Sequence, residues 1–201
     1  MRGPTDSLRR LDRGLMRRAR RVDSPGLDRA LVSITTAANY WRLWLAIAGL
    51  LGLAGGPRGR AAARRGLTAL VIAGLATNGP AKLLARRRRP SVGRPALIRM
   101  PRSTSFPSGH AAAAFGFAAA ATAELPALAP VLAPLAVAVG YSRVHTGVHY
   151  PSDVAAGAAI GLGSAVLSRR LSGHDAREAG HGASYAPSAA GDGAAHDPAV
   201  A

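Results

Sequence analysis

Long apolar segments that carry almost no charge alternate along this chain with clusters of arginine. The clusters lie at 9–21, 58–65, 86–102 and 169–170, and 25 of the 26 basic residues are arginine. A chain that crosses a bilayer keeps its charges between the spans, whereas a soluble core gives no reason for such an alternation. With 48% apolar residues and a formal net charge of +16, the sequence predicts an all-α integral-membrane protein.

The apolar segments predict about five membrane-spanning helices. Several are close to the lower limit of the roughly 17–25 residues that a bilayer requires. The predicted spans are 31–56, 66–85, 110–125, 127–144 and 153–168. An extra helix near 27–42 stays open, so we expect a polytopic transmembrane bundle of about five to six helices. Gly157 and Gly161 form a small-xxx-small pattern in the last span, which predicts close helix packing.

The two ends of the chain differ from this body in composition. In residues 1–30, apolar residues recur at near-helical spacing among the arginines: Leu8, Leu11, Leu15, Ala19 and Val22. This pattern favours an amphipathic helix on an anionic membrane surface over a disordered basic arm or a nucleic-acid-binding tail. Residues 172–201 lack apolar periodicity, which predicts a disordered tail. The transmembrane domain is then 31–171, and no nucleic-acid partner is expected.

The first strongly apolar run begins only near Leu43, so no cleavable signal peptide is expected. Acidic residues are scarce in the body of the chain. Only Glu124 and Asp153 occur between Asp28 and Asp175, too few for a carboxylate cage around a divalent cation. The absence of cysteine excludes disulfides and thiolate ligands. We therefore expect neither a metal nor a cofactor.

The first candidate motif ends the second predicted span, with the sequence KLLARRRRP at 82–90. Lys82 and Arg89 are two helical turns apart, so on a continuous helix they share one face and could clamp a phosphate. Lys82 lies within apolar sequence, where a charge is costly and usually functional. Arg86, Arg87 and Arg88 are interpreted as an anchor for the helix end.

The second motif, FPSGH at 106–110, opens the third predicted span. Ser108 suits a helix N-cap, and the free N–H groups of that helix end could bind a phosphate oxygen. Gly109 would let a ligand approach the backbone closely. A lone histidine in a first turn is more often structural than catalytic, so a role for His110 needs support from elsewhere in the chain.

The third motif, SRVHTGVHYPSD at 142–153, runs from the fourth predicted span into the fifth. Asp153 could simply cap that helix. It is also a scarce acid four residues after His149, and its carboxylate could fix the imidazole tautomer and leave the other ring nitrogen free to attack. His145 is interpreted as an interfacial or packing residue.

Together the motifs place eleven residues in the order K-x6-RP, PSGH and SR-x5-H-x3-D. This pattern resembles the type 2 phosphatidic acid phosphatase superfamily, which includes lipid phosphatases, bacterial acid phosphatases and vanadium haloperoxidases. The resemblance spans residues 82–153, with no substitution at a motif position. It implies an active site at the membrane interface, built from helix ends on one side.

The resemblance also implies a role for each motif residue. His149 would be the nucleophile that forms a phosphohistidine, Asp153 its orienting partner, and His110 the general acid. The residues that would hold the phosphoryl oxygens are Lys82, Arg89, Ser108, Gly109 and Arg143. Fixed cations would then meet the charge that a metal ion meets in other phosphatases.

Apolar spans and this site together predict a metal-independent lipid phosphatase of the cell membrane. The candidate substrates are phosphatidic acid, phosphatidylglycerol phosphate and polyprenyl phosphates or diphosphates, including decaprenylphosphoryl phosphoribose phosphate. The alternatives are a non-lipid acid phosphatase, a vanadate-binding haloperoxidase and a non-catalytic membrane scaffold. Basic segments near the site favour a cytoplasmic face. The family's lipid phosphatases commonly face outward, and we expect the extracytoplasmic face.

Overall fold

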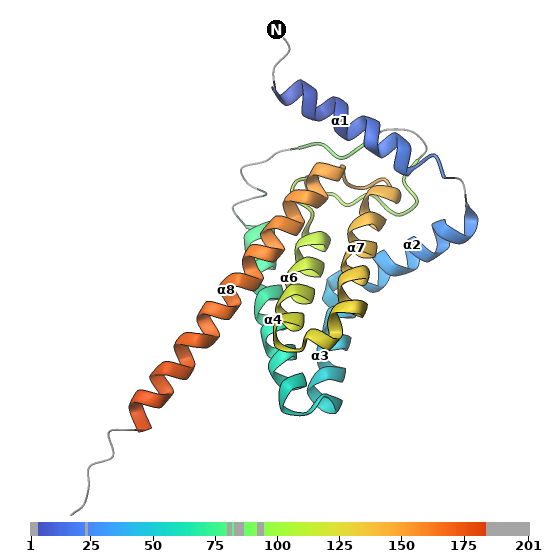
Figure 1. Ribbon diagram of the computed structural model, residues 1–201. Coiled ribbons are helices and arrows are strands. Elements are labelled where there is room, and N and C mark those ends of the chain that lie inside the picture. The colour runs from blue at the N-terminus through green and yellow to red at the C-terminus, as the bar shows by residue number, and fades with distance from the viewer. Residues whose placement is uncertain (1–3, 23, 80–81, 83–86, 92–94, 184–201) are drawn as a thin grey trace, which may run out of the picture.

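The computed structural model describes residues 4–22, 24–79, 82, 87–91 and 95–183, and the regular elements in them are all helical (Figure 1). The predicted all-α class is confirmed for this part of the chain. Four helices form the bundle that carries the motifs: α4 (Gly56–Asn78), α6 (Gly109–Glu124), α7 (Ala129–His145) and α8 (Pro151–Ala183). A 3-10 turn, η2 (Pro126–Leu128), connects α6 to α7.

A tight turn joins α3 (Arg42–Ala54) to α4. Gly56 has a φ of 61°, in the region that favours glycine. α4 begins earlier than the span predicted at 66–85, ahead of the basic cluster at 58–65, and it ends earlier, at Asn78. The helix bounds differ from the predicted span because the helix can include the basic cluster as long as its arginines stay exposed. Its arginines at 58, 60 and 64 are exposed, whereas Ala62 and Ala63 are buried.

The apolar segment predicted as one span at 31–56 is in fact two helices. α2 (Pro25–Ala37) ends before a 3-10 turn, η1 (Asn39–Trp41), in which Tyr40 and Trp41 have positive φ of 52° and 62°. The ring of Trp41 lies so close to Gly74 of α4 that a Cβ at residue 74 would be 2.4 Å from it. The break between α2 and α3 is thus accompanied by a contact with α4. The hydropathy of residues 31–56 alone does not predict this contact. The extra helix left open near 27–42 is α2.

α1 (Pro4–Ala19) lies across the end of the bundle, and α2 runs crosswise against α7 (Figure 1). One side of α1 is buried, with Asp12 2% and Met16 0% exposed. Leu8, Leu11 and Leu15 are exposed. The amphipathic helix predicted in residues 1–30 is therefore present, and its contact with a membrane surface stays a prediction.

α6 packs closely against α8 along small residues. A Cβ on Gly157 would lie 2.3 Å from Ser108 O, and one on Gly161 would lie 2.4 Å from Ala112 O. No larger residue fits at either position without moving the backbone of α6. The small-residue packing predicted for this helix is confirmed.

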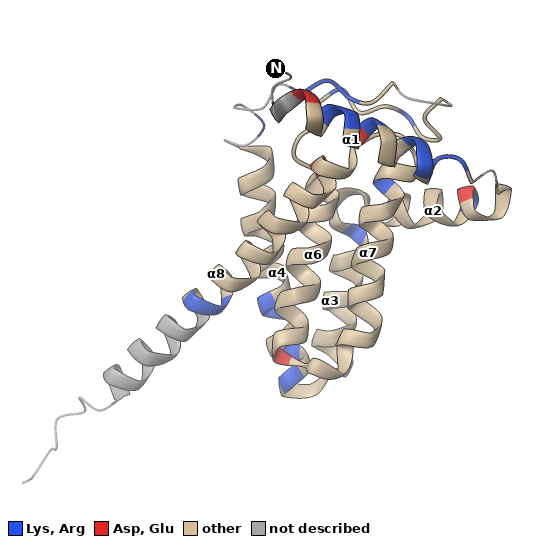
Figure 2. Ribbon diagram, turned by 45° about the horizontal axis from the view of Figure 1, so that its top comes forward, with Lys and Arg blue, Asp and Glu red and all other residues tan. Residues whose placement is uncertain are grey.

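Charged side chains gather mainly at the two ends of the bundle. Figure 2 shows Lys and Arg on α1 and the loops beside it, and again where α3 meets α4. By length and mean hydropathy, one segment of the described residues, Pro126–His145, suffices to cross a bilayer. α3 has 13 residues and α6 has 16, below the roughly 17–25 of a typical span. The number of helices that cross the membrane stays a prediction.

The last helix is longer than its predicted span of 153–168. α8 continues to Ala183, so its final turns fall within 172–201, the segment predicted to be a disordered tail. Residues 184–201 lie outside the described residues. The division of the chain into 1–30, 31–171 and 172–201 likewise stays a prediction.

Candidate active site

The three motifs meet at one end of the bundle. The end of α4, the start of α6, the end of α7 and the start of α8 all lie there (Figure 1). The short connection from α7 to α8 brings His149 to the same place as His110 at the start of α6. Helix ends on one side of the bundle therefore supply the site, as the sequence predicted.

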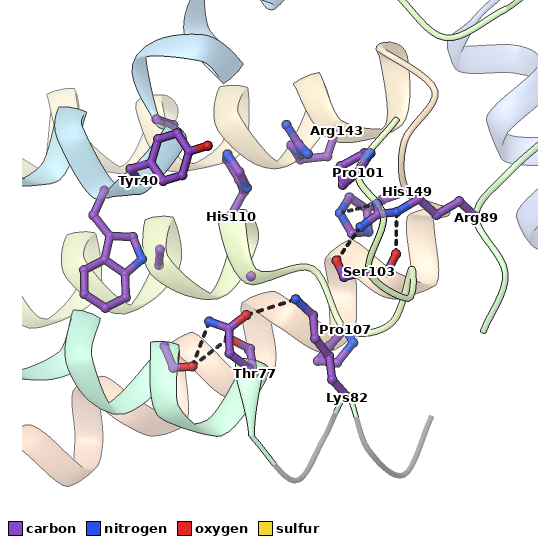
Figure 3. A pocket seen from close by; sticks show the side chains of 16 residues that line it. Tyr40, Thr77, Lys82, Arg89, Pro101, Ser103, Pro107, His110, Arg143 and His149 are labelled. Atoms are coloured by element: carbon purple, nitrogen blue, oxygen red, sulfur yellow. Dashed lines mark hydrogen bonds between the residues drawn. The ribbon is translucent and has the colours of Figure 1, made fainter. Parts of the chain in front are cut away.

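A cavity of about 220 Å³ lies between these helix ends (Figure 3). Six of the predicted site residues line it: Lys82, Arg89, Gly109, His110, Arg143 and His149. Its lining, as described, includes three cations and no carboxylate, so the cavity favours an anion. Asp153 and Ser108 lie behind this surface and are fully buried.

His149 presents its Nε2 atom to Arg89. Arg89 Nη1 lies 3.3 Å from His149 Nε2. Because a guanidinium can only donate, Nε2 must accept, and the proton of a neutral ring is then on Nδ1. Nδ1 faces Asp153 Oδ2 at 3.8 Å, within ion-pair range but too far for a hydrogen bond, and among the described residues it has no hydrogen-bond partner. Catalytic hydrogen bonds often tighten only when substrate binds.

The surroundings of His149 also keep its ring uncharged. Burial lowers the pKa of His149 to about 4, and Arg143 and Arg89 act in the same direction, against the attraction of Asp153. At pH 7 the imidazole is therefore neutral, and its Nε2 is unprotonated, as a nucleophile requires.

Asp153 is held by donors from three segments. Tyr150 N donates to Asp153 Oδ2 at 2.8 Å, and the Ser105 hydroxyl donates to the same oxygen through a short hydrogen bond. Arg87 Nη1 donates to Asp153 Oδ1 at 2.7 Å. The carboxylate is thus fixed on both oxygens, one toward Arg87 and the other on the side of His149.

Lys82 and Arg89 do not share a helical face, so that expectation is wrong. α4 ends at Asn78, and residues 87–90 are not helical. Lys82 Nζ donates to Asn78 Oδ1 at 2.9 Å, whereas Arg89 donates to the carbonyl oxygens of Ser103 and Val148 at 2.9 and 2.8 Å. Both cations nevertheless line the cavity. Burial lowers the pKa of Lys82, and repulsion from Arg89 adds to the effect.

Arg143 supplies a donor that no described residue uses. Its side chain is only 2% exposed, and one Nη atom donates to the Thr35 hydroxyl of α2 in a short hydrogen bond. Its Nε is buried without a hydrogen-bond partner among the described residues. A buried, unpaired N–H beside a cavity of this size fits a phosphoryl oxygen, because such donors are otherwise satisfied inside proteins.

The residues of the PSGH motif differ in how well their positions fit their predicted roles. The Ser108 hydroxyl accepts from Ala111 N at 3.4 Å. This contact favours helix capping over phosphate binding as the role of Ser108. Gly109 lines the cavity, and a Cβ there would meet only Thr77 Oγ1, at 3.6 Å. Packing alone does not require glycine at position 109. Space for a ligand is the better explanation for the glycine. His110 Nε2 lies 2.9 Å from Asn39 Oδ1 of η1.

Sequence reasoning missed four polar residues that support the site. Asn39 holds His110, Ser105 and Arg87 hold Asp153, and Asp12 of α1 holds Arg87. The sequence contained an indication for Asp12, because an acidic residue four positions from both Leu8 and Met16 lies on the same helical face as these apolar residues. Arg87 had none, since it lies in a run of four arginines.

Arg87 is therefore not the helix anchor that was predicted. Arg86 of the same run lies outside the described residues. His145 is fully buried and contacts Asp28 Oδ1 through Nε2 at 2.6 Å, which fits its predicted packing role. Within the part of the chain that the structure describes, no three histidine or acidic side chains form a metal-binding cluster. Metal independence stays a prediction.

Residues 64–176 match the family model of the PAP2 superfamily. A relative from Mycobacterium tuberculosis, named decaprenylphosphoryl-5-phosphoribose phosphatase, is 36% identical over 151 residues, covering 70% of this chain and 77% of the relative. The chain belongs to the PAP2 superfamily. The resemblance inferred from the three motifs is confirmed, and this PAP2 protein is a phosphatase.

Two solved structures share the fold of this PAP2 chain. Aquifex aeolicus LpxE superposes with a TM-score of 0.65 at 23% identity, covering 78% of this chain and 93% of its own. The first transmembrane PAP2 type phosphatidylglycerolphosphate phosphatase from Bacillus subtilis superposes with a TM-score of 0.64 at 24% identity, covering 85% and 89%. This chain therefore shares the helical arrangement of both solved structures.

Proposed function

We propose that this PAP2 protein is an integral-membrane lipid phosphatase that needs no metal ion and acts through a phosphohistidine on His149. One observation carries the proposal. The neutral imidazole of His149 faces a cavity lined by Lys82, Arg89 and Arg143, with the carboxylate of Asp153 behind it.

In the first step, His149 Nε2 attacks phosphorus, and the bond from phosphorus to the leaving oxygen breaks. His110 gives its proton to that oxygen, while Asp153 stabilises the positive charge that develops on the ring of His149. In the second step, water attacks phosphorus and gives a proton to His110. The phosphorus–nitrogen bond breaks and inorganic phosphate leaves. Throughout, the lining cations stabilise the charge on the phosphoryl oxygens.

The substrate class that we propose is a polyprenyl-linked sugar phosphate, the type named for the relative from M. tuberculosis. A second hollow of about 710 Å³ adjoins the cavity. The two share Tyr40, Pro101, His110 and Arg143. Arg99 and Arg102 also line the hollow, which suits a sugar and a second phosphate next to the one removed. Phosphatidic acid and phosphatidylglycerol phosphate are the competing substrates.

The test is a panel of lipid phosphates presented in detergent micelles to the purified protein, with phosphate release measured. We expect the highest kcat/KM for the polyprenyl-linked sugar phosphate and unchanged rates in the presence of EDTA. His149→Ala should abolish release while the yield of membrane-extracted protein stays the same. An active His149→Ala enzyme would remove the proposed nucleophile. Loss of activity in EDTA that is reversed by an added divalent ion would remove metal independence.

A further inference from the structure

A carboxylate from α1 reaches the first turn of α8, although the two segments are far apart in sequence. Asp12 is only 2% exposed. Its Oδ1 accepts from Ser152 N at 2.9 Å, and its Oδ2 accepts from Ser152 Oγ at 2.6 Å. Asp12 thus satisfies an N–H group at the N-terminal end of α8, where a negative charge is favourable. The next residue of that turn is Asp153.

Arg87 connects Asp12 to Asp153 by a second route. Its Nη2 donates to Asp12 Oδ2 at 2.6 Å, and its Nη1 donates to Asp153 Oδ1 at 2.7 Å. The guanidinium also lies over the ring of Tyr150, with Cζ 4.2 Å from the ring centroid. Burial opposes the charge of Arg87, but the hydrogen bond that Arg87 donates to Asp12 and the attraction of both carboxylates outweigh it and raise the pKa of Arg87.

The arrangement leaves Asp153 with little freedom. Arg87 holds Oδ1, while Oδ2 lies 3.8 Å from His149 Nδ1. If Arg87 moved away from Asp153, Oδ1 would lose this donor and the carboxylate would be free to rotate. Asp12 limits this movement because it accepts from Arg87 and from the N–H group of Ser152, in the turn that carries Asp153.

We propose that Asp12 is a positioning residue of the phosphatase reaction, which acts through Arg87 to hold Asp153 against His149. The proposal rests on the proposed role of His149 as the nucleophile. It makes α1 part of the active site, although the three motifs begin only at Lys82. Asp12 does not line the cavity and is not expected to touch the substrate.

Asp12→Asn keeps the shape of the side chain and removes its charge. The matched control is Asp6→Asn, an exposed acid in the first turn of the same helix. We expect Asp12→Asn to lower kcat by roughly 10- to 100-fold, the range typical of outer-shell residues that orient a metal-binding side chain. KM should change less than about twofold, because substrate contacts are intact. Asp6→Asn should match the unsubstituted enzyme.

A double-mutant cycle with Arg87→Gln distinguishes positioning from a general effect on folding. If Asp12 acts through Arg87, Asp12→Asn should have a much smaller effect on kcat in the Arg87→Gln background than alone. The pH profile gives a second readout. Without the charge of Asp12, the positive charge of Arg87 is less balanced, so the acid limb of kcat/KM should move to lower pH.

Three outcomes would overturn the proposal: an unchanged kcat in Asp12→Asn, equal losses with and without Arg87, or a loss matched by Asp6→Asn. Melting temperatures are measured for each variant, and a fall in kcat fully accounted for by unfolded protein also overturns it. His149→Ala is assayed in parallel. If it is inactive while Asp12→Asn is fully active, only the positioning role fails. If His149→Ala is active, the proposed function fails.

Discussion

A histidine buried among arginines binds a proton poorly, and this sets the chemistry of His149. Its pKa of about 4 follows from burial first and from Arg143 and Arg89 next, and the nearby carboxylate of Asp153 offsets them only in part. The cations that would hold the phosphoryl group thus also keep the proposed nucleophile in its neutral form. One set of side chains has both effects because all of them surround one small cavity.

The pH dependence of the enzyme should show this lowered pKa. The folded protein keeps His149 neutral down to about pH 4, so the acid limb of kcat/KM that belongs to His149 should lie well below 6.5, the ordinary pKa of histidine. Arg89→Gln removes one of the lowering charges and should move that limb toward higher pH. Steady-state rates between pH 3.5 and 8 measure both. An acid limb at 6.5 that Arg89→Gln leaves in place would contradict the assignment.

The same shift has a consequence for stability. Between pH 6.5 and about 4 the unfolded chain binds a proton at His149 and the folded chain does not, so the contribution of this residue to the free energy of unfolding falls as the pH falls.

At the scale of helices, the position of the site depends on how closely α6 and α8 approach. Gly157 and Gly161 face the backbone of α6, so the start of α8, with Asp153, lies beside the start of α6, with His110. Asp153 O also accepts from Ser108 N at 3.0 Å, which joins the two helix starts directly. A change in helix separation would therefore move Asp153 relative to His110, the two proposed catalytic residues, as well as reduce packing.

Two glycines of α8 provide a matched test of this contact. A Cβ at Gly161 would lie 2.7 Å from Gly116 N as well as 2.4 Å from Ala112 O, whereas a Cβ at Gly163 would meet nothing within 4 Å. Gly161→Ala should destabilise the protein by about 1–3 kcal/mol through overpacking. Gly163→Ala should be neutral or stabilising by about 0.5–1 kcal/mol, because alanine favours the helix. Thermal unfolding in detergent measures both, and equal melting temperatures for the two variants would contradict the packing.

At the scale of the molecule, the fold gathers the motif loops and α1 at one end and leaves the η2 connection at the other (Figure 1). Our proposal of an integral-membrane enzyme requires that these ends lie on opposite sides of the bilayer. We propose that the active-site end is extracytoplasmic, although basic residues gather near it (Figure 2).

The natural chain has no cysteine, so single cysteines can report the sidedness directly. Arg99→Cys places one at the active-site end, and Ala127→Cys places one in η2, where both native residues are exposed. A membrane-impermeant maleimide should label Arg99→Cys in intact cells and Ala127→Cys only after the membrane is permeabilised. The reverse pattern would place the site in the cytoplasm. Labelling of both variants in intact cells would contradict the proposal that the two ends of the bundle lie on opposite sides of the bilayer.

The sequence alone determined the helical class and predicted which residues meet at the cavity. Periodic apolar segments specify helices locally, and scarce residues such as Asp153 and Lys82 stand out against an Ala- and Arg-rich background. The close packing at Gly157 and Gly161 was also readable, because small residues at helical spacing indicate a contact whichever helix is the partner.

Only the tertiary structure decided which residues support that site. Arg87 is chemically identical to its neighbours in a run of arginines, and it differs from them only because Asp12 and Asp153 approach it from distant segments. In the same way, Asn39 reaches His110 because the chain breaks at η1, and Lys82 and Arg89 line the same cavity although Arg89 is not in a helix. Local periodicity fixes the elements, but the choice among equivalent side chains depends on contacts that exist only after the helices have packed.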